Sequence, residues 1–128
     1  MILIKYPKVM YPRTSNTLVE ISNLENVVGG SIDLVTLKNY TKLTALENIC
    51  LIVRDDGAKI PDPQPCLKIG RTILFGTIAA VGYTPDGDLR DLTAKEITAI
   101  DKFLILHSVT DRPFLTPTDL FGGSINNV

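Results

Sequence analysis

One stretch of the chain, residues 27–35, constrains the fold more than any other because its apolar spacing changes in the middle. Up to Val28 the apolar residues recur at helical steps, and from Ile32 onward they alternate with polar residues as in a strand. Gly29 and Gly30 lie between the two patterns, and a glycine that follows a helix can adopt positive φ without steric cost. The stretch therefore predicts a helix that ends at Gly29 and turns directly into a strand lying against it.

The helix before this corner is predicted to run over about residues 18–28. Thr17 and Glu20 match a capping box, in which the Thr hydroxyl and the Glu carboxylate each accept a hydrogen bond from an amide of the first turn. Apolar residues then follow at three- and four-residue steps and predict one buried helix face, made of Leu18, Ile21, Leu24 and Val28.

A second helix is predicted over residues 94–106. Thr93 and Glu96 form another capping box, and the buried face that follows consists of Ile97, Ile100, Phe103 and Leu104. His107 is the only histidine and lies near the negative end of this helix. We expect it to be a capping or surface residue.

Four apolar, β-rich stretches are predicted as strands: Ile2–Tyr6, Ser31–Leu37, Ile49–Arg54 and Thr72–Tyr83. The last contains Gly76 and Gly82, either of which marks a bulge. The three alternate prolines within residues 58–70 predict a stiff, polyproline-like surface loop, with an SH3-type ligand as the alternative. Between residues 38 and 48, Leu43 and Leu46 indicate a short helical turn capped by Thr41.

Together these elements predict an α+β fold: a small, mostly antiparallel sheet with two packed helices, at about residues 18–28 and 94–106, and an extended C-terminal tail. The length of 128 residues suits a single domain, which we expect to cover residues 1–107. The tail, residues 108–128, carries Phe114 and Phe121 among prolines that prevent a helix. We expect the tail to pack on its own or a neighbouring subunit, and the chain to be a homo-oligomer.

The composition argues against several classes of function. The net charge is −1 and no block of Lys or Arg is present, so we expect no nucleic acid partner. The longest uncharged apolar stretch, residues 73–83, is far below the roughly 20 residues of a membrane helix, and the N-terminal run is too short for a signal peptide. We therefore expect a cytoplasmic protein without a membrane partner. Cys50 and Cys66 have no ligand-spaced neighbours, so no metal, disulfide or cofactor is predicted.

Several short motifs follow one another in a fixed order between residues 17 and 104, beginning with Val-Gly-Gly-x-Ile-Asp. The residues that carry them are Gly29, Gly30, Ile32, Asp56, Gly57, Gly76, Thr77, Gly82, Asp86, Gly87, Leu92 and Thr93. In this order and spacing the chain resembles a family of small domains common in phages and other mobile elements. It departs from that pattern in the extra residues 38–48 and in the aromatic tail. The resemblance implies an α+β fold and a phage or mobile-element origin, and it implies no catalytic residues.

The sequence offers no pairing of a nucleophile with a base, so we do not expect an enzyme. The two glycines of the corner follow a helix, whereas a phosphate-binding loop precedes one. What remains is a set of arginines in loop-like contexts beside residues that can stack or donate, since Arg binds phosphate bidentately and an aromatic ring can hold a base. The candidate ligand-binding residues are Arg71, Arg112, Phe114, Arg13 and Tyr11. The structural alternative is that these arginines are solvated surface residues.

Three hypotheses for the function follow. The first is a non-catalytic, phage-encoded counter-defence protein, a sponge that binds a nucleotide second messenger of host immunity, such as a cyclic nucleotide, in the host cytoplasm. The second is a phage protein that inhibits a host factor through its tail or its proline segment. The third is an accessory role in the virion or its assembly.

Overall fold

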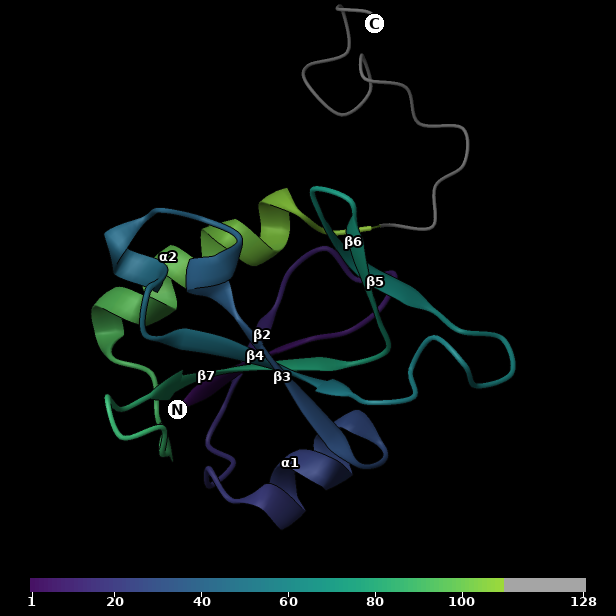
Figure 1. The fold of residues 1–128 in the computed structure, drawn as a ribbon, viewed down its shortest axis with the longest axis horizontal. Helices are drawn as coiled ribbons and strands as arrows, with labels where there is room; N and C mark the ends of the chain where they lie inside the picture. Colours follow the sequence, from purple (N-terminus) through teal and green to yellow (C-terminus); the bar gives the residue numbers. More distant parts are fainter. Residues whose placement is uncertain (110–128) are drawn as a thin grey trace, which may run out of the picture.

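The computed structural model describes residues 1–109, which form an α+β fold around an antiparallel sheet, as the sequence predicts (Figure 1). The main sheet has six strands in the order β2-β1-β7-β4-β3, with β8 paired to β7, and the hairpin β5–β6 forms a second sheet. The strands are β1 (Ile2–Lys5), β2 (Arg13–Ser15), β3 (Ile32–Thr36), β4 (Ile49–Arg54), β5 (Pro65–Ile69), β6 (Thr72–Phe75), β7 (Ile78–Tyr83) and β8 (Leu89–Arg90). The helices are α1 (Ile21–Val28) and α2 (Ala94–Leu106), with the short 3-10 turns η1 (Leu37–Asn39) and η2 (Thr44–Leu46).

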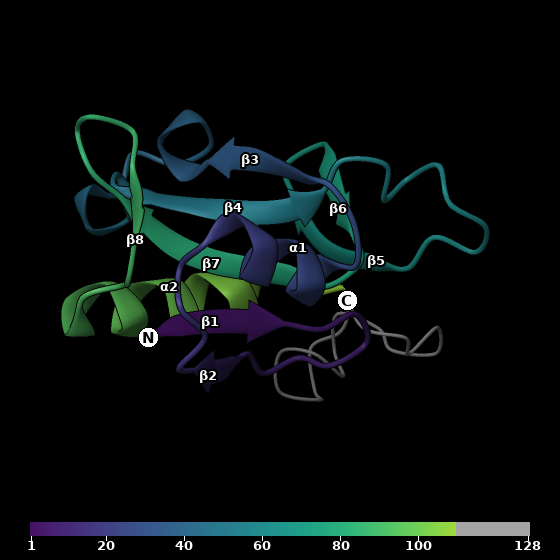
Figure 2. The ribbon, with the colours of Figure 1, turned by 90° about the horizontal axis from the view of Figure 1, so that it is seen from below.

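The main sheet is covered on both faces. Figure 1 views it nearly edge-on, with α1 on one side and with α2 and the hairpin β5–β6 on the other, and Figure 2 shows α1 lying across the sheet. Strand β4 therefore contributes to two cores. Leu51 and Val53 belong to the core under α2, whereas Cys50 and Ile52 belong to the core under α1. Side chains alternate between the faces of a strand, so a strand covered twice is apolar throughout.

The first helix is shorter than predicted. It begins at Ile21 rather than at residue 18, and its N-cap Glu20 makes no side-chain capping bond. The predicted capping box is wrong because the Thr17 hydroxyl lies 2.6 Å from the Ser15 hydroxyl instead. Leu18 and Ile21 are 67% and 53% exposed, so the buried face is made of only two of the four predicted residues, Leu24 and Val28.

The second helix agrees with the prediction from Ala94 to Leu106, and Thr93 and Glu96 form its capping box. Its buried apolar residues are Ile100, Phe103 and Leu104. His107 occupies the C-cap position, as predicted, and its backbone N–H donates to carbonyl oxygens of the last turn; its ring Nδ1 lies 3.1 Å from the carbonyl oxygen of Lys68 in β5.

The predicted strand over residues 72–83 is in fact two strands in different sheets. Gly76 separates β6 from β7 with a φ of 81°, and its N–H donates to the carbonyl of Gln64 at 2.8 Å. The proline segment also differs from its prediction, because Pro65–Ile69 pairs with β6 as strand β5 instead of remaining a polyproline-like loop. Pro65 is at the start of the strand, a position that tolerates a missing N–H.

The chain after α2 returns to the hairpin. Ser108 bridges Leu67, and the N–H of Val109 donates to the carbonyl of Cys66 at 2.9 Å, so the first residues of the predicted tail are attached to β5. The rest of the predicted tail, with Phe114 and Phe121, lies outside the described residues. Within residues 1–109, neither helix has the length and apolarity that a membrane crossing requires.

Candidate ligand-binding groove

The glycine corner between α1 and β3 has a structural role. Gly29 adopts the predicted left-handed conformation, with a φ of 87°, and its N–H donates to the carbonyl of Glu25 at 2.8 Å. A Cβ atom at Gly30 would lie 2.8 Å from Nε of Arg54, which in turn donates to Oδ1 of Asp56 at 2.5 Å. The glycines therefore end the helix and leave room for an arginine that is held by a carboxylate.

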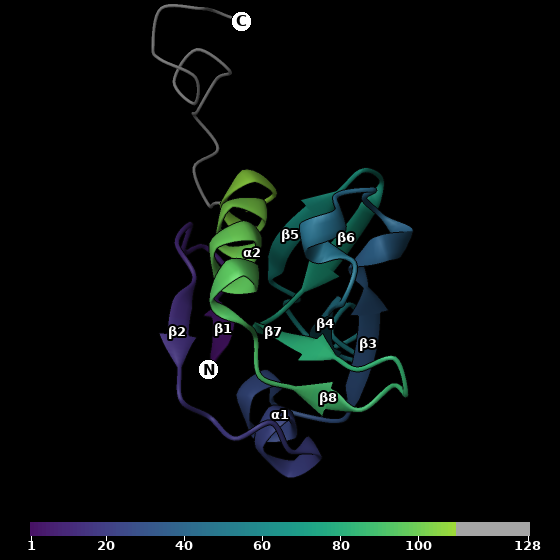
Figure 3. The ribbon, with the colours of Figure 1, turned by 90° about the vertical axis from the view of Figure 1, so that its left-hand side faces the viewer.

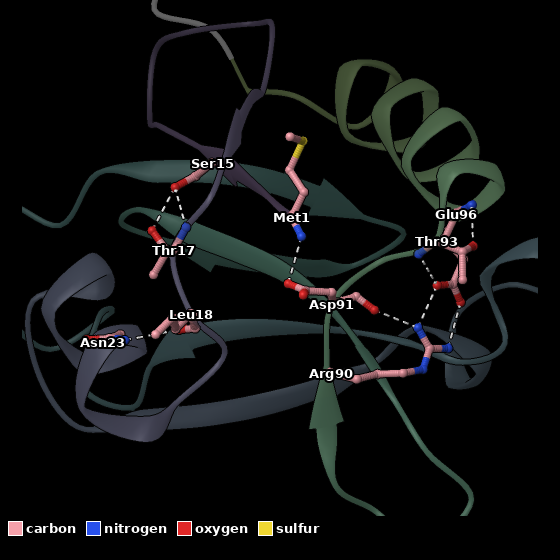
Figure 4. Close-up of polar contacts among 9 residues, drawn as sticks. All are labelled: Met1, Ser15, Thr17, Leu18, Asn23, Arg90, Asp91, Thr93 and Glu96. Carbon is pink, nitrogen blue, oxygen red and sulfur yellow. Dashed lines mark hydrogen bonds and ion pairs between the residues drawn. The ribbon is translucent and has the colours of Figure 1, made fainter.

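A second arginine is held in the same way beside β7, as Figure 4 shows for its polar contacts. A Cβ atom at Gly82 would overlap the guanidinium of Arg90. Arg90 donates from Nη1 and Nη2 to the two carboxylate oxygens of Glu96, at 2.7 and 3.0 Å, and the Arg90 hydrogen bond lowers the pKa of Glu96. Glu96 also accepts from the N–H of Thr93 at 2.9 Å, so one carboxylate serves both the arginine and the helix cap. These motif residues stabilise the fold.

Lys5 is a core residue, and its burial was not predicted from the sequence. It is fully buried in β1, where its ammonium donates to the carbonyl of Tyr6 at 3.0 Å and lies 3.9 Å from Sγ of Cys66. Burial lowers the pKa of Lys5 and raises the pKa of Cys66 to about 11. A thiol with such a pKa stays protonated and unreactive at neutral pH, so we assign this pair a structural role.

The predicted ligand-binding residues do not meet in one pocket within residues 1–109. Arg71 is exposed at the two-residue turn of the hairpin β5–β6, directly after Gly70 with its φ of 61°. Tyr11 and Arg13 are exposed beside and on β2, the edge strand of the other sheet, and Figures 2 and 3 show β2 apart from the hairpin. The other two candidates, Arg112 and Phe114, lie outside the described residues.

The structure offers instead a groove between η2 and α2, which we call the η2–α2 groove. It has a volume of about 450 Å³. Its lining combines the buried residues Leu46 and Phe103 with the half-buried Ala99 and two exposed leucines, Leu43 and Leu106. The remaining lining residues are Thr44, Ala45, Lys95, Thr98 and Lys102.

Two cationic side chains line this apolar groove. Lys95 and Lys102 are seven positions apart, which places them on the same face of α2 about 10 Å apart along its axis. Within residues 1–109 neither side chain makes an ion pair or a hydrogen bond. Asp101 is the sequence neighbour of Lys102, but consecutive helix residues do not face each other. Among the residues that the structure describes, none of those lining the groove is a carboxylate, so this lining is apolar and positively charged.

The sequence contained a partial signal for this groove. Lys95, Thr98, Lys102 and Leu106 follow one another at three- and four-residue steps, along the side of the predicted helix opposite to its core residues. A leucine that continues a polar stripe marks a surface available for binding. That η2 lies beside this stripe could not be predicted, because the contact joins segments about fifty residues apart.

Comparisons with known proteins give no relative from which a function could be transferred. No protein-family model, no curated protein and no solved structure matches this chain.

Proposed function

We propose that this protein is a non-catalytic binding protein that captures a partner protein in the η2–α2 groove, as an inhibitor of a host factor would. The observation that carries the proposal is an apolar groove with two ammonium groups on one helix face that have no partner within residues 1–109. Its polar side chains are two threonines and two lysines, a set suited to holding a partner rather than to proton transfer. Exposed leucines beside a groove are also typical of interaction sites.

The experiment is affinity capture with the full chain as bait, followed by binding measurements with each purified captured protein. Ala99→Arg places a bulky charge in the groove, and Ile73→Arg makes the same kind of change at an exposed apolar residue of the hairpin. The proposal predicts that Ala99→Arg weakens binding of the partner at least tenfold and that Ile73→Arg leaves it unchanged. A partner that binds both variants equally well would place the interface outside the groove.

A second candidate function is the sequestration of a nucleotide second messenger of host immunity. It is supported by the resemblance to phage domains and by Arg71, whose side chain is exposed at a tight turn and makes no ion pair or hydrogen bond within residues 1–109. Such a guanidinium is available for a phosphate. Together the resemblance and the arginine favour a counter-defence protein that binds but does not degrade its ligand.

Calorimetry with cyclic dinucleotides, cyclic trinucleotides and cyclic ADP-ribose variants tests this second function. Loss of a phosphate-binding arginine removes roughly 1.5–3 kcal/mol, so Arg71→Ala should weaken binding about ten- to a hundredfold. Arg13→Ala tests the other predicted site in the same titration. If the parent protein binds none of these nucleotides, the hypothesis of nucleotide sequestration is wrong. That result would not bear on the proposal that the groove captures a partner protein.

A further inference from the structure

The two leucines beside the η2–α2 groove indicate the size of the molecule that would occupy the groove. Leu43 is 60% exposed and Leu106 is 73% exposed, although both are large apolar residues. They lie in the lining with Leu46 and Phe103, which are buried and continuous with the core. An occupant that covers both leucines must extend beyond the groove itself, as a peptide segment does.

The two lysines indicate the charge pattern of the occupant. Lys95 and Lys102 are two helical turns apart, about 10 Å along α2. A small amphiphile with one anionic head group would pair with only one of them. Two carboxylates one heptad apart on a facing helix have the matching spacing, because seven residues return to the same helix face.

The dimensions of α2 favour a helical occupant. With 13 residues, α2 is about 20 Å long, which is a common length for a helix–helix contact. The small side chains of Ala99 and Ala45 in the lining let a second helix approach closely. Amphipathic helices bind such grooves through apolar residues at positions i, i+3, i+4 and i+7.

We propose that the η2–α2 groove binds an amphipathic helix of a partner protein, with leucine-type anchors on one face and two acidic residues one heptad apart. This inference rests on the proposed binding function and specifies the partner. The leucine anchors lie between Leu43 and Leu106, and the two acidic residues pair with Lys95 and Lys102. Because these pairs are exposed, they set orientation and specificity more than affinity.

Fluorescence anisotropy with designed peptides tests the inference on the full chain. The probe is a labelled helical peptide of about 14 residues, four turns, with leucines on one face and two glutamates one heptad apart. The comparison peptide carries lysines in place of the glutamates. The protein variants are Lys95→Gln with Lys102→Gln, and, as a matched double control, Lys59→Gln with Lys68→Gln at exposed lysines outside the groove lining.

The inference predicts that the acidic peptide binds at least tenfold more tightly than the basic one. It also predicts that this preference disappears in the Lys95/Lys102 variant, persists in the Lys59/Lys68 variant and decreases with added salt. Equal binding of the two peptides, or a preference that survives loss of Lys95 and Lys102, would overturn it. A dimer of the full chain in light scattering that Ala99→Arg dissociates would also overturn it, because a second copy would then occupy the groove. Suppose that Ala99→Arg weakens binding of a captured partner but the acidic peptide does not bind. The inference about the acidic helix then fails, and the proposed binding function stands.

Discussion

Gly82 has a role that depends on Arg90 beside it. The guanidinium of Arg90 occupies the place that a Cβ atom at Gly82 would take. Gly82→Ala should therefore lower the free energy of unfolding by roughly 1–3 kcal/mol, measured in urea, because overpacking forces side chains and backbone to shift. The double variant Gly82→Ala with Arg90→Ala removes the overlap, so the two costs should not add. Simple additivity would show that the overlap does not limit this position.

Lys5 makes the stability of the core depend on pH. Burial lowers the pKa of Lys5 below its ordinary value of 10.5, so the unfolded chain binds more protons than the folded one in the alkaline range below that value. Stability should therefore rise as the pH increases through that range. Lys5→Met removes the buried amine while keeping a long side chain.

The Lys5→Met variant should be more stable than the parent by on the order of 1 kcal/mol or more at neutral pH, because a buried amine with few partners is costly. Urea unfolding at a series of pH values provides the measurement, with the exposed Lys68 replaced by Met as the control. A Met variant that is less stable than the parent at neutral pH would show that the hydrogen bond to Tyr6 outweighs the cost of burial.

The capping box of α2 links local sequence to the tertiary fold. Glu96 accepts hydrogen bonds from Arg90 and from the N–H of Thr93, and its pKa is lowered chiefly by the Arg90 hydrogen bond. The stabilisation from the ionised Glu96 is present above the ordinary carboxyl pKa of 4.5 and is lost as the pH falls through the lowered value.

Glu96→Gln should therefore lower stability by about 1–3 kcal/mol at neutral pH, with a smaller loss in acid. Thermal or urea unfolding of parent and variant at both pH values gives the two differences. Lys95→Gln is a suitable control, since within residues 1–109 the Lys95 side chain makes no hydrogen bond or ion pair with this cap. An equal loss at neutral and acid pH would mean that the charge of Glu96 does not contribute.

The two capping boxes show what the sequence could and could not predict. Thr93 and Glu96 form the box that their spacing predicts, whereas Thr17 and Glu20 have the same spacing and do not. A local pattern gives the possibility of a cap, and the difference comes from competing contacts, here the hydroxyl of Ser15. The assignment of β6 and β7 to different sheets likewise depends on long-range pairing that no local pattern contains.

For the whole molecule, the fold class was predictable and the site was not. Changes in the spacing of apolar residues, together with the glycines, predicted the end of α1, the corner after it and most strands. These features depend on neighbours in the chain. The η2–α2 groove arises from the packing of residues 43–46 against a helix about fifty residues later. Loop-like sequence contexts made Arg71 and Arg13 candidates for one site. In the structure Arg71 lies at the turn of the hairpin β5–β6, whereas Arg13 lies in β2 of the main sheet.

Charge is distributed unevenly over the molecule. The chain as a whole has a net charge of −1, yet the groove lining within residues 1–109 contains two lysines and no carboxylate. A local cationic site on a nearly neutral protein attracts an acidic partner with little general affinity for polyanions. The proposed capture of one partner protein requires such selectivity.

A map of amide chemical shifts in the full chain, recorded during titration with the acidic helical peptide, tests most directly whether the η2–α2 groove is the binding site. Binding in the η2–α2 groove predicts the largest changes in two segments, residues 43–46 and residues 95–106. The same titration with the Ala99→Arg variant should show these changes only at much higher peptide concentration. Changes centred on the hairpin turn at Arg71 or on β2, or no changes at all, would contradict the claim that this groove is the binding site.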